Sequence, residues 1–282
     1  MLQVLVGTLY SGEKELDRCV DALTQQHYCH RSHFIIEHMP ERAAHDELYR
    51  RFMHNAGEYD LFLKLDADMI LTDPGKLGAA VKLFEDSPEL DHAVFTVQDW
   101  MTDSAIIGIH MYRNRVRWAR RGDDLFADLP PQLQGKRRYV THGPPSPLAD
   151  HSPDPSPIQA FHYGLHRGIK AFQTGLDETR PAYAVAHWRG LKRLWRHFDR
   201  VRDRRLGLAL MAVEHGLTHP ADPDFCNYTN PRFWQTFAMY EPMTPQQIHA
   251  HLRPAWDSPV RREAMWLRTF VRQLVRRRRK AG

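Results

Sequence analysis

Two aspartates that stand two positions apart, Asp66 and Asp68, follow the apolar run 61–65. Such a run is typical of a buried β-strand, and ligand sites in open α/β sheets lie at the carboxyl ends of strands. Mg²⁺ and Mn²⁺ prefer oxygen ligands and leave positions open for phosphate oxygens. The spacing therefore indicates a divalent cation site. The alternative is that both aspartates only end the strand in a turn.

Histidines supply the other candidate metal ligands, because imidazole is an acceptable partner for Mn²⁺. His187 follows the apolar run 182–186, which we expect to form a short strand, and it is the candidate third ligand. A strand-end histidine before a basic, solvated helix is the alternative. His162 and His166 are four residues apart and share a helical face, but they lack the glutamate and cysteine partners of a zinc site.

The first hundred residues alternate short apolar runs with amphipathic stretches, which is typical of βαβ units. We expect strands over 2–6, 34–36, 61–65, 93–97 and 106–112, and helices after Ser11, over 43–55 and after Pro74. The last of these helices should bury Leu77, Ala80, Val81 and Phe84. Further helices are expected over 158–173, 206–213 and 260–279. Six prolines between 143 and 157 predict a mobile connection without a ladder or helix.

The order of these segments resembles the GT-A-fold glycosyltransferases, whose DxD strand binds the metal and the sugar nucleotide. The resemblance covers residues 1–112 and implies an α/β fold with a GT-A-like open, mainly parallel sheet flanked by helices, followed by a helical C-terminal extension. It implies that Asp66 contacts the ribose or the metal and that Asp68 binds Mn²⁺ or Mg²⁺. It also implies that Thr8 and Tyr10 lie beside the base and ribose, with simple turn chemistry as the alternative for both.

A second resemblance concerns the segment 187–195, which is similar to the HxxGxxKPW motif of the family 8 retaining glycosyltransferases. It implies that His187 binds the metal and that Lys192 or Arg193 contacts the diphosphate. The sequence departs from the motif at Arg193, where that family has Lys, and at Leu194, where it has Pro. Arg is chemically adequate here because its guanidinium makes bidentate contacts with phosphate.

The catalytic base has two candidates, Asp203 and Asp99. The segment around Asp203 and Leu206 resembles the ED-x-x-L helix start of inverting enzymes such as family 2, although Arg202 replaces the glutamate. A solvated ion pair with a neighbouring arginine is the alternative for Asp203. Asp99 and Asp103 follow the strand after the DxD and are candidates to contact donor sugar or acceptor. The two motifs imply opposite stereochemistry, so retention and inversion both stay open.

The basic charge of the chain is concentrated at its end. The net charge is +5, yet residues 261–280 carry eight Arg and Lys280 against Glu263, a surplus of 9 − 1 = +8, which leaves 5 − 8 = −3 for the rest. The stripe Val260, Ala264, Leu267, Val271 and Leu274, with Trp266 and Phe270 beside it, is apolar. Such a helix suits an anionic membrane surface, or else it packs on the core and carries a charged tail. Nucleic acid is disfavoured because no recognition motif accompanies the charge.

Other features of the composition indicate the cellular compartment of the protein. No uncharged apolar stretch approaches the roughly 20 residues of a membrane span, and the first residues lack the basic segment of a signal peptide. Three cysteines without paired spacing fit a reducing compartment. We therefore expect a cytoplasmic protein, and a peripheral position on the inner face of the cytoplasmic membrane is a candidate refinement.

These observations predict four regions: a nucleotide-sugar-binding half (1–112), a mobile Pro-rich connection (113–157), an acceptor-side half of the same domain (158–255) and a basic amphipathic helix (256–282). The expected function is metal-dependent transfer of a sugar from a nucleoside-diphosphate sugar to a glycan or lipid-linked acceptor in bacterial surface polysaccharide synthesis. A nucleotidyltransferase is a rival, but the first turn lacks the basic Gly-rich loop that a triphosphate needs. The non-enzymatic rival is a basic adaptor for membrane or nucleic acid.

Overall fold

The computed structural model describes residues 1–119, 131–133, 137–141, 143, 145–172, 181–218 and 223–281. The chain forms two compact units, each of which is described by itself. The first comprises residues 1–100 and the described parts of 104–155. The second comprises Met101–Asp103 and the described parts of 156–281. The change of unit near residue 155 falls at the end of the proline-rich stretch.

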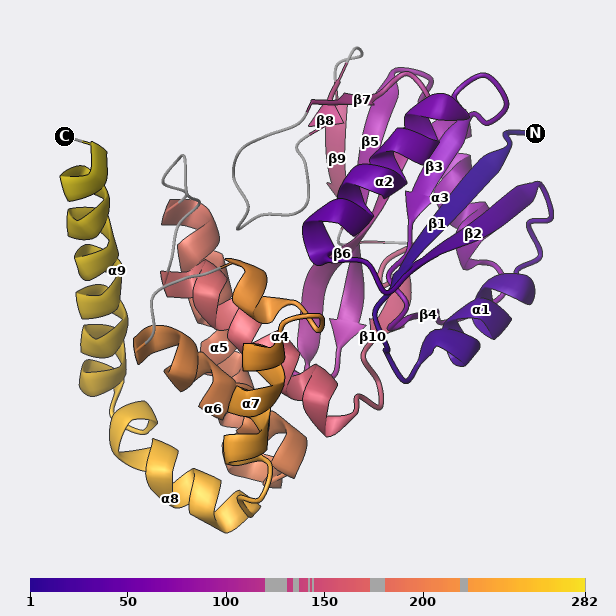
Figure 1. The fold of residues 1–282 in the computed structure, drawn as a ribbon. Helices are drawn as coiled ribbons and strands as arrows, with labels where there is room; N and C mark the ends of the chain where they lie inside the picture. The colour runs from indigo at the N-terminus through magenta and orange to yellow at the C-terminus, as the bar shows by residue number, and fades with distance from the viewer. Residues whose placement is uncertain are drawn as a thin grey trace. The chain divides into compact units, whose positions relative to one another are not determined.

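The first unit is built on one sheet with the strand order β2-β1-β3-β6-β5-β10-β4, and β9 also pairs with β5 (Figure 1). The strands are β1 (Val4–Tyr10), β2 (Arg31–Glu37), β3 (Leu61–Lys64), β4 (Met69–Leu71), β5 (Leu90–Asp99), β6 (Ser104–Arg113), β9 (Arg137–Thr141) and β10 (Ala149–His151). Strands β7 (Arg117–Trp118) and β8 (Pro131–Gln132) form a separate two-stranded sheet. The α/β class expected from the sequence is confirmed for this unit.

The sheet is mixed, so the expectation of a mainly parallel one is not confirmed. Strand β1 is parallel to β2 and β3, but β6 is antiparallel to both β3 and β5. The physical reason is the length of the connection between β5 and β6, which spans only residues 100–103. A connection this short can join only antiparallel neighbours, because a parallel pair needs a crossover of a dozen or more residues.

Helices cover both faces of the sheet, and alternate residues of β1 belong to different cores. Val4 and Val6 pack in the core that includes residues of α1 (Leu16–Thr24) and α3 (Lys76–Glu85). Leu5 packs in the core that includes residues of α2 (Glu41–His54). The predicted inner face of α3 is confirmed, since Leu77, Ala80, Val81 and Phe84 are all buried.

The proline-rich stretch contains a strand of the sheet, so the expectation that it holds no ladder is wrong. Strand β10 inserts between β5 and β4 and pairs parallel to the first and antiparallel to the second. Its three residues contain no proline, and Pro147 and Pro153 flank it. The prolines therefore bound the strand and remove no hydrogen bond from within it.

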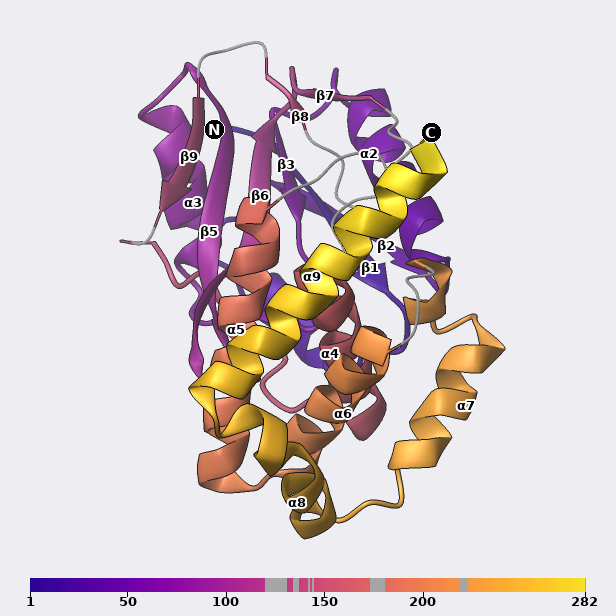
Figure 2. The same ribbon diagram turned by 90° about the vertical axis from the view of Figure 1, so that its left-hand side faces the viewer.

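The second unit is helical. Its elements are α4 (Pro157–Phe172), α5 (Pro181–Val201), α6 (Arg204–Thr218), the short 3₁₀ helix η1 (Pro223–Cys226), α7 (Pro231–Tyr240), α8 (Pro245–Trp256) and α9 (Pro259–Ala281). Helices α4 and α6 cross so closely that a Cβ on Gly164 would lie 1.8 Å from the carbonyl oxygen of Ala209. In Figure 2, α9 crosses the side of this unit that faces the viewer. None of the helices that the structure describes is long and apolar enough to cross a membrane.

The strand expected over 182–186 is wrong, because these residues form the first turns of α5. Ala184, Trp188, Leu191, Trp195 and Phe198 are buried at helical spacing along this helix. Ala182, Ala184 and Ala186 are strong helix formers, so both propensity and periodicity favour the helix. A five-residue window was too short to separate the two patterns.

Candidate functional site

The DxD segment forms the tight turn between β3 and β4 at the carboxyl end of β1. The backbone N–H of Ala67 donates to the Leu9 carbonyl at 3.2 Å, which continues the pairing of β1 beyond the end of β3. The N–H of Met69 donates to the Asp66 carbonyl at 3.0 Å and closes the turn. Ala67 is fully buried, and the carboxylates of Asp66 and Asp68 retain side-chain exposures of 32% and 18%.

An imidazole from β10 lies between two of the carboxylates. His151 Nε2 is 3.3 Å from Asp68 Oδ2, and His151 Nδ1 is 2.7 Å from Asp99 Oδ1. Asp99 is fully buried at the end of β5, beside β10 in the sheet. The order of the strands thus brings together residues 68, 99 and 151, which are far apart in the sequence.

Burial and mutual attraction have opposite effects on these groups. Burial alone would lower the pKa of His151, but the negative charges and hydrogen bonds of Asp68 and Asp99 raise it to about 10. Burial alone would raise the pKa of Asp68, but the charge of His151 and the hydrogen bonds from His151 and Ser152 lower it to about 2. In the absence of a metal the cluster therefore holds a protonated His151 imidazole beside the charged carboxylate of Asp68.

Ser152 fixes Asp68 through both its backbone and its side chain. Its N–H donates to the Asp68 carbonyl at 2.8 Å, and its hydroxyl donates to Asp68 Oδ2 at 2.5 Å. Its φ is +46°, a left-handed conformation that few residues other than glycine adopt. Backbone strain of this kind persists where surrounding contacts hold it and is common at functional sites.

Asp66 has a different environment from Asp68. Its Oδ2 lies 3.3 Å from the ammonium nitrogen of Lys64, whose side chain is only 6% exposed. Its carbonyl oxygen lies 3.8 Å from the thiol sulfur of Cys19 on α1. Burial, with the nearby charges of Asp68 and Asp66, raises the pKa of the Cys19 thiol to about 12, so this cysteine is not a reactive thiolate.

The loop between β1 and α1 adds a carboxyl group to the same neighbourhood. Glu13 Oε2 accepts a hydrogen bond of 2.6 Å from the N–H of Ser11. Burial, reinforced by the charges of Asp68 and Asp66, raises the pKa of Glu13 to about 7. A carboxyl group that titrates near neutrality is suited to general acid–base chemistry. The loop is joined to the segment after β10 by an ion pair between Lys14 and Asp154.

The donor set of this cluster fits a divalent cation. Asp68 offers carboxylate oxygen and His151 offers the Nε2 nitrogen of its imidazole. Asp99 accepts a hydrogen bond from the other ring nitrogen, Nδ1. This is the arrangement in which a second carboxylate orients a metal-binding histidine. Across the part of the chain that is described, no group of three or more His, Cys, Asp and Glu side chains has the spacing of a complete metal site. Asp68 and His151 would therefore supply two ligands, with the remaining positions left for substrate or water.

The residues expected beside the base and ribose lie at the carboxyl end of β1. Thr8 is fully buried, and its hydroxyl lies 2.9 Å from Nε2 of His33 on β2. Tyr10 is partly buried, with its ring centroid 5.1 Å from that of His38. Tyr10 therefore retains a partly accessible ring, whereas Thr8 is occupied in the contact between strands.

Three predicted residues, His187, Lys192 and Arg193, lie on α5 in the second unit, whereas the DxD turn belongs to the first unit. His187 does not end a strand. It lies on the helix with its Nδ1 3.3 Å from an Arg167 guanidinium nitrogen. Burial together with the charges of Arg167 and Lys170 lowers its pKa well below the ordinary value. Cationic neighbours oppose binding of a metal ion, so the role of third ligand that we expected for His187 fits His151 better.

The other members of the expected diphosphate motif serve helix packing or lie at the surface. Lys192 Nζ is 2.8 Å from Glu263 Oε1 on α9. Arg193 is exposed on α5.

His162 and His166 stack on α4 with ring centroids 5.9 Å apart, and His162 also stacks on Tyr228.

The two candidate bases have structural partners. Asp203 precedes α6, accepts a hydrogen bond of 2.8 Å from the N–H of Arg205, and pairs with the Arg205 guanidinium at 2.8 Å. Burial would raise the pKa of Asp203, but these contacts lower it, which makes the carboxylate a weak base. Asp99 faces His151, as described above, and Asp103 pairs with Arg200 in the second unit. The role of Asp203 as catalytic base stays a prediction.

Sequence reasoning missed His151, Ser152 and Glu13. His151 and Ser152 stand among prolines in a stretch whose composition indicates a loop, and a three-residue strand gives no periodic signal. Glu13 lies in the segment after Ser11, where the sequence pattern predicts only the start of a helix. Neither the known protein-family models nor the curated proteins give a match to this chain.

Proposed function

We propose that this protein is a metal-dependent glycosyltransferase that moves a sugar from a nucleoside-diphosphate sugar to a glycan or lipid-linked acceptor in the synthesis of bacterial surface polysaccharide. The observation that carries the proposal is the apposition of Asp68 with His151 and Asp99 at the carboxyl ends of β3 and β5. Ligands of open α/β sheets bind at this edge. The proposal includes a GT-A-like arrangement of the first unit.

Each residue of the cluster has a role in this proposal. Asp68 and His151 bind Mn²⁺ or Mg²⁺, and Asp66 binds the metal or the ribose of the donor. Asp99 is a positioning residue, because it holds Nδ1 of His151 so that Nε2 is directed toward Asp68. When bound, the cation supplies Lewis-acid stabilisation of the charge that develops on the leaving nucleoside diphosphate.

The surroundings of the cluster suit this chemistry. Lys64 orients the carboxylate of Asp66, and Ser152 fixes the carboxylate of Asp68. Glu13 titrates near neutrality beside both aspartates and is a candidate to accept or donate a proton. The sequence motifs leave retention and inversion open, so no acceptor base is assigned.

Calorimetric titration of UDP and GDP, with Mn²⁺ or with a chelator, tests the proposal. We expect binding only with the metal, and we expect Asp68→Asn and His151→Ala to abolish it. Asp150→Asn is the matched control, because Asp150 precedes His151 on the same strand and its side chain alternates to the other face. Each variant is accepted if its circular dichroism spectrum shows that it is folded at the temperature of the titration.

Three outcomes would contradict the proposal. Nucleotide binding that is as strong in chelator as with Mn²⁺ would show that the site does not depend on a metal. Binding that survives both Asp68→Asn and His151→Ala places the nucleotide elsewhere. Absence of binding by UDP, GDP, CDP and CMP under every metal condition favours the non-enzymatic adaptor. If binding is as expected, hydrolysis of the matching nucleotide sugar in the absence of acceptor identifies the donor.

A further inference from the structure

Helix α9 has an inner face that is fixed to the second unit. The indole N–H of Trp266 donates to the Ala171 carbonyl on α4 at 2.9 Å, and its ring stacks on Trp188 of α5 with centroids 6.1 Å apart. Glu263 accepts hydrogen bonds of 2.8 Å from both Trp188 Nε1 and Lys192 Nζ. The single acidic residue of the segment 261–280 is therefore directed inward and neutralised.

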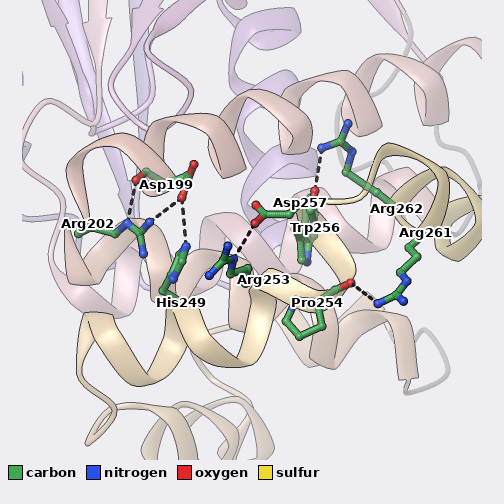
Figure 3. Close-up of polar contacts among 9 residues, drawn as sticks. All are labelled: Asp199, Arg202, His249, Arg253, Pro254, Trp256, Asp257, Arg261 and Arg262. Carbon is green, nitrogen blue, oxygen red and sulfur yellow. Dashed lines mark hydrogen bonds and ion pairs between the residues drawn. The ribbon is translucent and has the colours of Figure 1, made fainter.

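The corner between α8 and α9 is held by hydrogen bonds to main-chain carbonyls (Figure 3). Arg262 donates to the Trp256 carbonyl at 2.9 Å, and Arg261 donates to the Pro254 carbonyl at 3.3 Å. Arg253 pairs with Asp257 at 2.9 Å across the end of α8. These contacts set the direction in which α9 leaves α8 and thereby determine which of its faces points outward.

The outer face of α9 carries large apolar side chains that remain exposed. Val260 is 80% exposed, Leu267 54% and Val271 46%. Their spacings of seven and four residues place them in one stripe of the helix. Arg261 and Arg268, which are both exposed, follow Val260 and Leu267 by one residue and so border the stripe on one side.

We propose that this outer face of α9 binds the surface of an anionic lipid bilayer, with the helix lying in the plane of the interface. The apolar stripe would enter the boundary between headgroups and acyl chains, and the bordering arginines would meet lipid phosphates. Charge complementarity supports this partner, because residues 261–280 carry +8 while the rest of the chain carries −3. Attraction to an anionic leaflet is then concentrated at one helix and orients the protein.

Two other partners fit this face less well. A second copy of the chain would oppose one cationic helix to another, and like charges across an interface are costly. Nucleic acid phosphates would pair with the arginines, but they would make no favourable contact with the exposed aliphatic stripe. The stripe also contains no aromatic side chain that could stack on bases. Both partners are outcomes of the test.

Cosedimentation of the full chain with vesicles tests the proposal. We expect binding to vesicles of phosphatidylcholine mixed with phosphatidylglycerol, little binding to phosphatidylcholine alone, and weakening by salt. The double variant Leu267→Gln/Val271→Gln should weaken binding by about tenfold or more, because it removes the buried apolar contact. Arg268→Gln should weaken it about fivefold, the effect of one basic residue near an anionic surface.

Met239→Gln is the matched control, because Met239 is 66% exposed on α7 of the same unit and the change is of the same kind. Vesicle binding requires neither metal nor nucleotide, so its result is independent of the transferase proposal. Equal binding by the wild type and the Leu267/Val271 variant overturns the proposal. So does binding to duplex DNA that exceeds binding to anionic vesicles, or a dimer that this double variant dissociates.

Discussion

One charged cluster of the first unit and one ion pair of the second unit differ in their burial. In the first unit Asp99 is fully buried, and the cluster that it forms with His151 and Asp68 is nearly so. In the second unit the pair between Lys192 and Glu263 leaves 28% and 44% of those side chains exposed. A buried cluster must be complete to be tolerated, whereas a partly exposed pair contributes little. The difference teaches that the cluster of Asp68, Asp99 and His151 depends on its own completeness, whereas the pair on α5 and α9 is screened by solvent.

The largest expected effect comes from His151→Leu in the first unit. The change removes the protonated imidazole between Asp68 and Asp99 and leaves the buried Asp99 carboxylate without this positive partner. We therefore expect the first unit to lose about 3–5 kcal/mol of stability. Hydrogen exchange measured by mass spectrometry localises the loss, because it reports each unit separately. A loss below about 1 kcal/mol would show that the cluster is solvated and would contradict the comparison.

The next effect comes from Gly164→Ala in the second unit. A Cβ at this position would meet the main chain of Ala209 at 1.8 Å, and a backbone cannot give way as a side chain can. We expect α4 and α6 to separate at a cost of about 3 kcal/mol, measured by urea denaturation. Gly78→Ala on α3 is the control, since its nearest neighbour is Tyr28 at 3.9 Å and helix propensity should stabilise the protein by about 0.5–1 kcal/mol. Equal effects at both positions would show that α4 and α6 are not closely packed.

Glu13→Gln tests the pH dependence of the first unit. The pKa of Glu13 is raised from 4.5 to about 7, so the folded state favours the protonated acid. The stability that this proton contributes is present below pH 4.5 and is lost as the pH rises through 7. In chelator, the variant should match the wild type below pH 4.5 and exceed it by about 3 kcal/mol above pH 7. If the stability of the wild type and of the variant changed with pH in the same way, the raised pKa of Glu13 would be contradicted.

The smallest effect is expected for Lys192→Ala. The pair with Glu263 is partly exposed, so its removal should cost about 0–1 kcal/mol of stability in the second unit. Thermal melting followed by tryptophan fluorescence measures this, because five of the seven tryptophans (188, 195, 234, 256 and 266) belong to that unit. A loss comparable to that of His151→Leu would remove the distinction between buried and surface charge.

Much of the first unit was predictable because its elements have clear periods. Strands β1, β2, β3, β5 and β6 fall where short apolar runs predict them, and the inner face of α3 follows its spacing. The second unit was predictable where helices are long, as for α4, α6 and α9. The start of α5 was not, because five residues of alternating alanine fit either structure.

Local sequence pattern likewise identified some residues of the candidate site and misplaced others. Local pattern was enough to single out Asp66 and Asp68, because a strand and the carboxylates that end it are neighbours in the chain. Local pattern also singled out His187, which resembles a known motif but lies on a helix beside Arg167.

The sequence by itself determined the α/β character of the first half, the position of the paired aspartates and the concentration of basic charge in the last helix. Only the tertiary structure decided that His151 and Asp99 join Asp68, because that depends on β10 inserting between β5 and β4. Tertiary structure likewise decided that Trp266 packs inward while Leu267 faces outward on α9. The physical reason is that pairing between distant strands and docking of helix faces are set by contacts remote in sequence, which local periodicity does not contain.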